Sequence, residues 1–302
     1  MIYEYAIEPE IIIEWSKNTR DFREFFDKYG LGSPRIFSSF PKGKPNKLRT
    51  YLLENGPDEN KRYIEMVNYL IKSLVLRSGN CSNEKDWVKK VVHESNQKPF
   101  GVVLTNTSLG IQRSVTLSSM YDLESLWHHK DQKSIQRTSD GISSVISNLF
   151  SLSTKKIVII DPYGWTSDFI KQIQILINDI KMGRINNELP KVIVYFQKSK
   201  KGDNPNADYV SDEIIKGLSE CVENFTIDVY ELTENDNSDE FHNRCVLTEH
   251  GGVMLGHGIG IKGEEFKTDD AVLLKSEIFY KKWDQFVENN TFEVVSRSTT
   301  NI

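Results

Sequence analysis

The chain is short of cysteine, of long apolar runs and of positive charge, and each shortage excludes a class of protein. Its 302 residues include three cysteines, too few and too widely spaced for a disulfide framework, which favours a reducing, cytoplasmic setting. Apolar runs such as 157–160 fall far short of the roughly 18 residues that a membrane-spanning helix needs. The first residues lack the basic segment and apolar core of a secretory signal. We therefore expect a soluble cytoplasmic protein.

The charge balance also bears on nucleic-acid binding. A protein that binds DNA phosphates without regard to sequence usually has a basic excess, because it gains affinity by releasing condensed counterions. This chain has 38 Lys+Arg against 43 Asp+Glu and a formal net charge of -5. Any contact with nucleic acid must therefore come from a local cluster of positive charge.

The length and a change of pattern near residue 130 predict two domains. Single domains commonly have about 100–200 residues, fewer than the 302 of this chain. Residues 127–140 are polar and poor in core residues, which is typical of a linker. We expect an α-rich accessory module with a small β element at 1–130 and an α/β domain at 131–302.

Apolar residues in the first domain recur at helical spacing. The large apolar side chains at 11, 12, 15, 22, 25 and 26 predict a helix from Glu8 to Lys28. Such an aromatic stripe most simply forms a core, with a partner-binding groove as the alternative. Further helices are expected at 48–55, 58–77 and 83–93, followed by strands at 100–105 and 113–118.

The second domain alternates short apolar strands with helices. Strands are expected at 156–161, 192–196 and 225–232, and helices at 141–151, 167–182 and 209–221. Near-continuous apolar strands joined by helices are typical of parallel β-α-β units covered on both faces. The expected fold class is α/β with a mostly parallel sheet and a terminal β-hairpin.

The hairpin carries the residues with the most chemistry. Two strand-like runs flank His250-Gly251-Gly252, and glycines between such runs predict a tight turn. His242 and Arg244 are two residues apart, so on a strand they project from the same face. Pairing across the turn brings Gly256, His257 and Gly258 opposite Arg244, to within one residue. A guanidinium offers a planar fork to phosphate oxygens, and an imidazole attacks phosphorus or carries a proton, so this end predicts a phosphate site.

These residues follow a frame that resembles the phospholipase D superfamily. That family carries His-x-Lys, four residues, Asp, about six residues and Gly-Ser; here the frame reads His242-x-Arg244, four residues, Glu249, six residues and Gly256-His257. It is most similar to a divergent branch with a single His-x-Arg motif. That branch includes the domain at the C-terminus of MIT-domain proteins and bacterial proteins of mobile-element and phage-defence neighbourhoods. The strand that ends in Asp161-Pro162-Tyr163 also resembles the entry to that fold, and the resemblance covers about residues 135–290.

The resemblance implies a phosphodiesterase that needs no metal or other cofactor, most simply a nuclease component of a bacterial defence or mobile-element system. In that family two motifs meet: one histidine forms a phosphoenzyme bond and the other protonates the leaving oxygen. A chain with one motif would therefore act as a homodimer. By this pattern His242 is the nucleophile or acid/base and Arg244 the phosphate ligand. Glu249 and His257 are further catalytic candidates, and Asp161, Asn243 and Gly256 are candidates for substrate binding.

Departures from the family pattern keep an alternative open. Arg244 preserves the positive charge of lysine, whereas Glu249 lies an odd number of residues from His242 and is expected to stabilise the hairpin. His257 replaces a serine hydroxyl. The alternative is a non-catalytic protein that binds phosphate, nucleic acid or a protein partner and serves in assembly. The first domain would supply a partner contact, or would itself carry the main activity.

A zinc site is a further interpretation of the same segment. His242, His250 and His257 lie within sixteen residues, with Cys245 and Glu249 among them. Structural zinc sites usually combine two pairs of closely spaced ligands, and no second cluster accompanies this one. We therefore predict no metal site.

Overall fold

The computed structural model describes residues 1–78, 86–180, 184–202, 204–219, 224–236, 238, 240–261 and 267–302. Cys81 and Cys221 lie outside these ranges, as do parts of the helices predicted at 83–93, 167–182 and 209–221. Among the described residues, we find no helix with the length and apolar character needed to cross a membrane.

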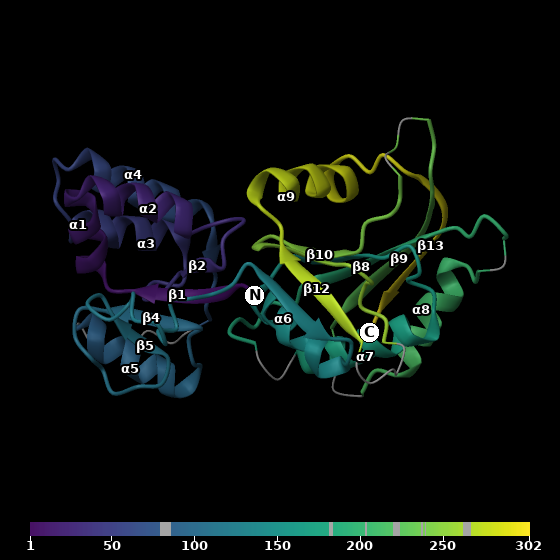
Figure 1. Cartoon of the computed structure of the whole chain (residues 1–302), viewed down its shortest axis with the longest axis horizontal. Helices are drawn as coiled ribbons and strands as arrows, with labels where there is room; N and C mark the ends of the chain where they lie inside the picture. The colour runs from purple at the N-terminus through teal and green to yellow at the C-terminus, as the bar shows by residue number, and fades with distance from the viewer. Residues whose placement is uncertain are drawn as a thin grey trace. The chain divides into compact units, whose positions relative to one another are not determined.

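Two compact units make up the chain. The N-terminal unit comprises Ile2–Lys130 and Ile185–Asn187, and the C-terminal unit comprises Met1, Asp131–Arg184 and Glu188–Ile302. Each unit combines helices with one sheet, which confirms the α/β class (Figure 1).

The N-terminal unit is built on a parallel sheet of order β3-β2-β1-β4-β5. Its strands are β1 (Tyr3–Ile7), β2 (Arg35–Ser38), β3 (Leu74–Val75), β4 (Val102–Thr105) and β5 (Ser114–Thr116). Its helices are α1 (Pro9–Lys17), α2 (Thr19–Lys28), α3 (Pro45–Glu54), α4 (Lys61–Lys72) and α5 (Trp87–Gln97). In Figure 1, α1 to α4 lie on one side of this sheet and α5 on the other.

Side-chain alternation along the central strands creates two cores. Tyr5 of β1 and Leu104 of β4 pack in the larger cluster with residues of α1 to α4. Ala6 and Val103, their neighbours in sequence, face the opposite way and pack with Trp87 of α5. Because both faces are covered, most positions of these strands are apolar and buried.

The N-terminal sheet is larger than the small β element that the sequence predicts. β1, β2 and β3 have two to five residues each, too few for an apolar pattern to distinguish a strand from a loop. The predicted helix from Glu8 to Lys28 is in fact two helices. The Asn18 side chain accepts a hydrogen bond from the Arg20 backbone N–H and caps α2, so one helix ends and the next begins there.

The C-terminal unit is built on a sheet of order β13-β9-β8-β7-β10-β11-β12-β6. Its strands are β6 (Gln132–Gln136), β7 (Lys156–Ile160), β8 (Lys191–Gln197), β9 (Thr226–Thr233), β10 (Cys245–Thr248), β11 (Gly251–Leu255), β12 (Thr268–Leu273) and β13 (Glu293–Asn301). Its helices are α6 (Ser139–Leu152), α7 (Ser167–Ile180), α8 (Ala207–Lys216), α9 (Ser276–Trp283) and the π-helical turn η1 (Asp284–Glu288). Figure 1 shows α6, α7 and α8 on one side of the sheet and α9 on the other.

The predicted β-α-β-α-β run forms the centre of this sheet. β7, β8 and β9 pair in parallel and are joined through α7 and α8. β7 is apolar and buried along almost its whole length, as expected of a strand covered on both faces. The flanking strand pairs are all antiparallel, so the wholly parallel sheet is the one in the N-terminal unit.

The predicted hairpin is present as β10 and β11. Cys245 pairs with Met254 and Thr248 pairs with Gly251, which leaves Glu249 and His250 in the turn. The hairpin lies inside the sheet, between β7 and β12.

The linker predicted at 127–140 is wrong in part. Residues 132–136 form β6, the edge strand that pairs with β12, and Trp127 is buried in the core of the N-terminal unit. An edge strand with alternating exposed residues has the polar composition of a loop, which explains the error.

Candidate functional site

A cavity of about 330 Å³ lies where β7 ends, β10 begins and β11 ends. This is the carboxyl end of the parallel strand β7, the position at which α/β sheets commonly bind ligands. The residues that line it are Arg137, Asp161, Tyr163, Thr166, Asp168, Phe169, Arg244, His257 and Gly260. Three of the predicted site residues, Asp161, Arg244 and His257, therefore come together here.

The hairpin register positions Arg244 in the cavity. The Leu255 backbone N–H donates to the Arg244 carbonyl at 2.9 Å, and the Arg244 Nη1 donates to the Gly256 carbonyl at 2.8 Å. Gly256 thus contacts the arginine, as the sequence predicts, but through its carbonyl oxygen. The Arg244 Nε is buried and makes no hydrogen bond with the residues that the structure describes.

Arg137, which no signal in the sequence identifies, is the second arginine of the cavity. It lies between β6 and α6, and its Nη2 donates to the Gly260 carbonyl at 3.0 Å. Its Nε is also buried, with no hydrogen-bond partner among the described residues. A buried N–H without a partner costs free energy, whereas the positive charge of two arginines at one cavity favours an anionic, oxygen-rich ligand.

Asp161 faces these arginines from the end of β7 and is 4% exposed. Its Oδ1 lies 3.9 Å from the Arg244 Nε, too far for a hydrogen bond, and accepts one from the Tyr163 backbone N–H at 2.9 Å. Burial raises its pKa to about 6, although the Tyr163 hydrogen bond and the charges of Arg244 and Arg137 oppose the rise. A carboxyl group that titrates near neutral pH can carry a proton in catalysis.

At Gly258 the backbone passes close to the side chains of Asp161 and Arg244. The φ of Gly258 is +79°, a left-handed conformation that glycine adopts without steric cost. A Cβ at this position would overlap the Asp161 Oδ2 and lie 3.0 Å from the Arg244 Cδ. Close approach of the backbone thus requires glycine here.

His257 is held at the mouth of the cavity by Asp269. The Asp269 carboxylate accepts the His257 backbone N–H at 3.0 Å, and its Oδ1 lies 3.2 Å from the His257 Nδ1. The imidazole is 63% exposed, whereas the Asp269 side chain is 4% exposed. A buried carboxylate that orients an accessible imidazole is an arrangement suited to proton transfer or nucleophilic attack.

His242 lies outside this cavity. β10 begins at Cys245, so His242 and Arg244 precede the strand, and the expectation that they share a strand face is wrong. The His242 side chain is 75% exposed, and its Nε2 lies 3.1 Å from the Glu240 carboxylate. Asn243, the predicted substrate contact between them, is half-buried and does not line the cavity.

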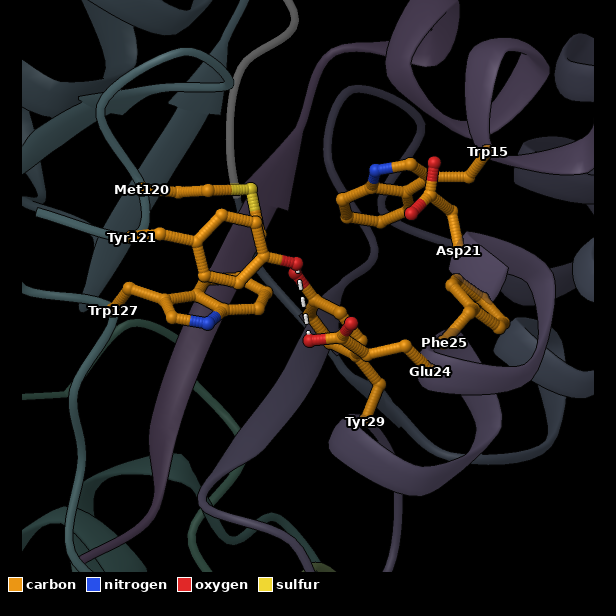
Figure 2. A pocket seen from close by; sticks show the side chains of 8 residues that line it. All are labelled: Trp15, Asp21, Glu24, Phe25, Tyr29, Met120, Tyr121 and Trp127. Carbon is orange, nitrogen blue, oxygen red and sulfur yellow. Dashed lines mark hydrogen bonds between the residues drawn. The ribbon is translucent and has the colours of Figure 1, made fainter. Parts of the chain in front are cut away.

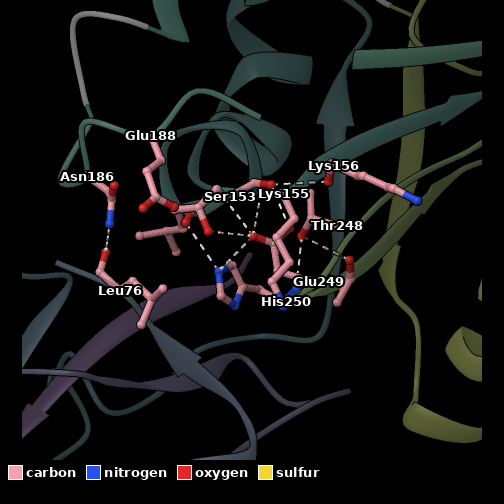
Figure 3. A network of polar contacts seen from close by, with 12 residues as sticks. Leu76, Ser153, Lys155, Lys156, Asn186, Glu188, Thr248, Glu249 and His250 are labelled. Atoms are coloured by element: carbon pink, nitrogen blue, oxygen red, sulfur yellow. Dashed lines mark hydrogen bonds and ion pairs between the residues drawn. The ribbon is translucent and has the colours of Figure 1, made fainter. Parts of the chain in front are cut away.

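Glu249 lies at the opposite end of the hairpin, in the turn (Figure 3). Its carboxylate accepts hydrogen bonds from the backbone N–H groups of Thr154 and Lys155 and from the Ser153 hydroxyl. Burial opposes its ionisation, but the neighbouring His250 and these hydrogen bonds together hold the pKa of Glu249 below its usual value. Its contacts tie the turn to the segment before β7.

The zinc interpretation gains no support from the described residues. None of them forms a group of three or more histidine, cysteine, aspartate or glutamate side chains suited to a metal. His250 is buried, with its Nε2 3.2 Å from the Leu152 carbonyl, and Cys245 is buried within β10.

Two residues of the site, Arg137 and Asp269, are not predicted from the sequence. Arg137 follows a segment with the composition of a linker, so nothing places it near the hairpin. Asp269 belongs to β12, a strand after the hairpin that the sequence pattern does not predict. A strand after Gly258 with a buried acidic residue would have been the signal for Asp269, because buried carboxylates usually have a specific partner.

Comparisons with known proteins give likenesses at the level of structure alone. No family model and no curated protein matches the chain. Nuc, a phospholipase D family member from Salmonella typhimurium, is 11% identical, with a TM-score of 0.33 over 55% of this chain and 97% of that one. Phosphatidylserine synthase from Haemophilus influenzae Rd KW20 is 11% identical, with a TM-score of 0.31 over 56% of this chain and 46% of that one.

A third solved structure is TrmBL2, an archaeal chromatin protein. It is 12% identical, with a TM-score of 0.28 over 59% of each chain. All three TM-scores are below 0.5, so they assign the chain to no family, and the function must be inferred from the residues of the site.

Proposed function

We propose that the C-terminal unit binds a phosphodiester in the arginine-lined cavity and hydrolyses it as a phospholipase D-like enzyme. The observation that carries this proposal is that Arg137 and Arg244 both line one cavity, beside Asp161 and His257. Guanidinium groups bind phosphate oxygens through charge-assisted hydrogen bonds, so two arginines at one cavity favour a phosphate ligand.

The proposed catalytic groups are the two histidines, His257 and His242. His257, oriented by Asp269, faces the cavity that the arginines line. His242 is two residues from Arg244 and largely exposed, hence accessible to substrate and to a second copy of the chain. In the proposed reaction one histidine attacks phosphorus and displaces an alkoxide, which a proton donor neutralises. Water then hydrolyses the phosphohistidine and restores the imidazole.

The proposed substrate is nucleic acid, and the proposed active form is a homodimer. The net charge of -5 disfavours broad binding along a duplex but is compatible with one cationic pocket. A homodimer would bring together two copies of the single His-x-Arg motif around a two-fold axis. A role in bacterial defence or in a mobile element rests on the sequence resemblance.

A second function, binding without hydrolysis, is favoured by one observation. The His242 side chain pairs with Glu240 and does not line the cavity that holds Arg244. In that case the arginines would hold a phosphodiester that serves assembly, and cleavage would be absent.

A cleavage assay with matched variants tests the proposal. The protein is incubated with end-labelled single- and double-stranded DNA and RNA in EDTA, as wild type and as His242→Ala, His257→Ala and Arg244→Gln. His93→Ala is the control, because His93 is an exposed residue of α5 that contacts Gln97. We expect cleavage in the wild type and the control, and loss of at least about 100-fold without a catalytic histidine.

The outcomes separate the two functions. No cleavage, together with oligonucleotide binding that Arg244→Gln weakens, would favour the binding function and reject the enzyme. Light scattering measures the oligomeric state. A strict monomer that still cleaves nucleic acid would reject the proposed homodimer. Neither cleavage nor binding would reject both functions.

A further inference from the structure

A small aromatic pocket with an acidic rim lies within the N-terminal unit (Figure 2). Its walls include the rings of Trp15, Tyr29, Tyr121 and Trp127, and its rim carries the carboxylates of Asp21 and Glu24. These residues come from three separate segments: α1, α2 with the residue that follows it, and the chain after β5. The proposed phosphodiesterase makes no use of them.

The rings pack directly against one another and form a continuous aromatic wall. The ring centroids of Trp15 and Tyr29 are 5.8 Å apart, and those of Tyr29 and Trp127 are 5.6 Å apart. Tyr121 meets Trp127 edge-on at 6.3 Å. The negative faces of such rings attract a cation within about 6 Å of their centroids.

The acidic rim gives the pocket a preference for positive charge. Asp21 and Glu24 are three residues apart on α2, so they lie on the same side of the helix. The Tyr121 hydroxyl donates to the Glu24 Oε1 at 3.1 Å. Burial first, and then the charges of Glu24 and Asp21, raise the pKa of Tyr121 to about 12, consistent with a negative local field.

A buried hydroxyl at the pocket has no partner among the described residues. Tyr29 is 2% exposed, and its Oη makes no hydrogen bond with any residue that the structure describes. In Figure 2 the Tyr29 hydroxyl end reaches toward the Tyr121 hydroxyl and the Glu24 carboxylate. The pocket therefore offers oxygen acceptors that a ligand with N–H donors would satisfy.

The volume limits the ligand to a compact head group. The enclosed space is about 10 Å³, and the whole pocket with its open mouth is about 210 Å³. The enclosed part is close to the minimum that holds one water-sized group. A primary ammonium group matches this size, whereas a quaternary ammonium carries four carbon substituents.

Other ligand classes fit less well. An anion would be repelled by Asp21 and Glu24, and an apolar group would leave the Tyr29 hydroxyl without a partner. Arg35 already lies over the Trp127 ring, 4.2 Å from its centroid. This arrangement shows that the same aromatic cluster accommodates a cation.

We propose that this pocket binds the primary ammonium group of an alkylamine, as found at the end of a lysine side chain or of a linear polyamine. The ammonium nitrogen occupies the enclosed space, donates to the Tyr29 hydroxyl and the Glu24 carboxylate, and lies against the aromatic rings. The alkyl chain leaves through the mouth.

Calorimetric titration of the full chain with n-butylammonium, tetramethylammonium and n-butanol tests this proposal. At low salt we expect n-butylammonium to bind with a Kd of roughly 1 mM, and the other two at least about tenfold more weakly. Binding of n-butanol equal to that of n-butylammonium would overturn the preference for a cation. Equal binding of tetramethylammonium would overturn the size limit, and no binding of n-butylammonium would overturn the site.

Three variants test whether n-butylammonium binds in this pocket. Glu24→Gln should weaken n-butylammonium binding about tenfold, and Asp27→Asn, an exposed position on the same helix, should leave it unchanged. Tyr29→Phe should weaken binding without lowering the urea midpoint, because the hydroxyl has no partner among the described residues to lose. Unchanged binding in Glu24→Gln and Tyr29→Phe, or a lowered midpoint in Tyr29→Phe, would contradict the proposal. Nα-acetyl-lysine methylamide and spermidine, titrated in parallel, distinguish the two sources of the ammonium group.

Discussion

The two ends of the β10–β11 hairpin share one short sequence motif and differ in chemistry. At the turn, the Glu249 carboxylate accepts hydrogen bonds from Ser153, Thr154 and Lys155, in the segment before β7. At the open end, the Arg244 Nη1 donates to the Gly256 carbonyl, but its buried Nε has no hydrogen bond to any described residue and lies 3.9 Å from the Asp161 Oδ1. Satisfied polar groups stabilise a fold, whereas unsatisfied buried ones cost stability, and the open end also borders the arginine-lined cavity. The turn therefore contributes stability, and the open end is suited to binding.

The two ends should also respond in opposite ways to pH. The pKa of Glu249 is lowered in the fold, so its contribution to stability is present above its unfolded pKa and is lost as pH falls. The pKa of Asp161 is raised from 3.8 to about 6, so ionisation of Asp161 lowers stability as pH rises through that interval. One end is stabilised by its charge and the other is destabilised by it.

The largest effect on stability is expected from Glu249→Ala. The change leaves the backbone N–H groups of Thr154 and Lys155 without their acceptor, and should lower the free energy of unfolding by about 3–4 kcal/mol at pH 7. Urea denaturation at pH 7 and at pH 3.5 measures this loss of unfolding free energy. The loss should be smaller at pH 3.5. A stable Glu249→Ala variant that has lost phosphodiester binding would contradict the assignment of this end to stability.

Asp161→Asn should act in the opposite direction. A pKa raised from 3.8 to about 6 corresponds to about 3 kcal/mol of destabilisation at neutral pH, which the uncharged amide removes. We expect the variant to unfold at higher urea than the wild type at pH 8, with the difference vanishing near pH 4. A variant that is less stable than the wild type at pH 8 would show that the Asp161 charge supports the fold.

Gly258→Ala should have a smaller effect, confined to the open end. The new Cβ would press on Asp161 and displace Arg244, so oligonucleotide affinity should fall about tenfold. Gly202→Ala is the matched control, because Gly202 has a similar φ of +69° and a Cβ there would have no described atom within 4 Å. Fluorescence anisotropy with a labelled oligonucleotide compares the two. An equal loss of oligonucleotide affinity in Gly258→Ala and Gly202→Ala would show that backbone strain alone causes it.

The sequence predicts the hairpin and the central strands because their signals are local. The run Lys156–Ile160 is apolar after its first residue, and two glycines follow the turn at Glu249-His250. The same local pattern brings Arg244, Gly256 and His257 to one end of the hairpin. The motif spacing cannot show that β10 begins at Cys245. It therefore predicts a strand position for His242, which in the structure precedes the strand.

The remaining site residues depend on long-range pairing. Arg137 reaches the cavity because β6 pairs with β12, a contact between residues that lie more than 130 positions apart. Asp269 meets His257 because β12 pairs with β11. No spacing within a short window encodes either contact, and the polar composition of β6 hides it among loops.

The most direct test of the phosphodiester cavity is a double-mutant cycle on its two arginines. Oligonucleotide affinity is measured by anisotropy for the wild type, Arg137→Gln, Arg244→Gln and the double variant. If both guanidinium groups hold one phosphodiester, each single change should weaken binding at least about tenfold. The loss of binding free energy in the double variant should then be smaller than the sum of the two single losses. Unchanged affinity in Arg137→Gln would contradict the account, because it would remove this cavity from the binding site.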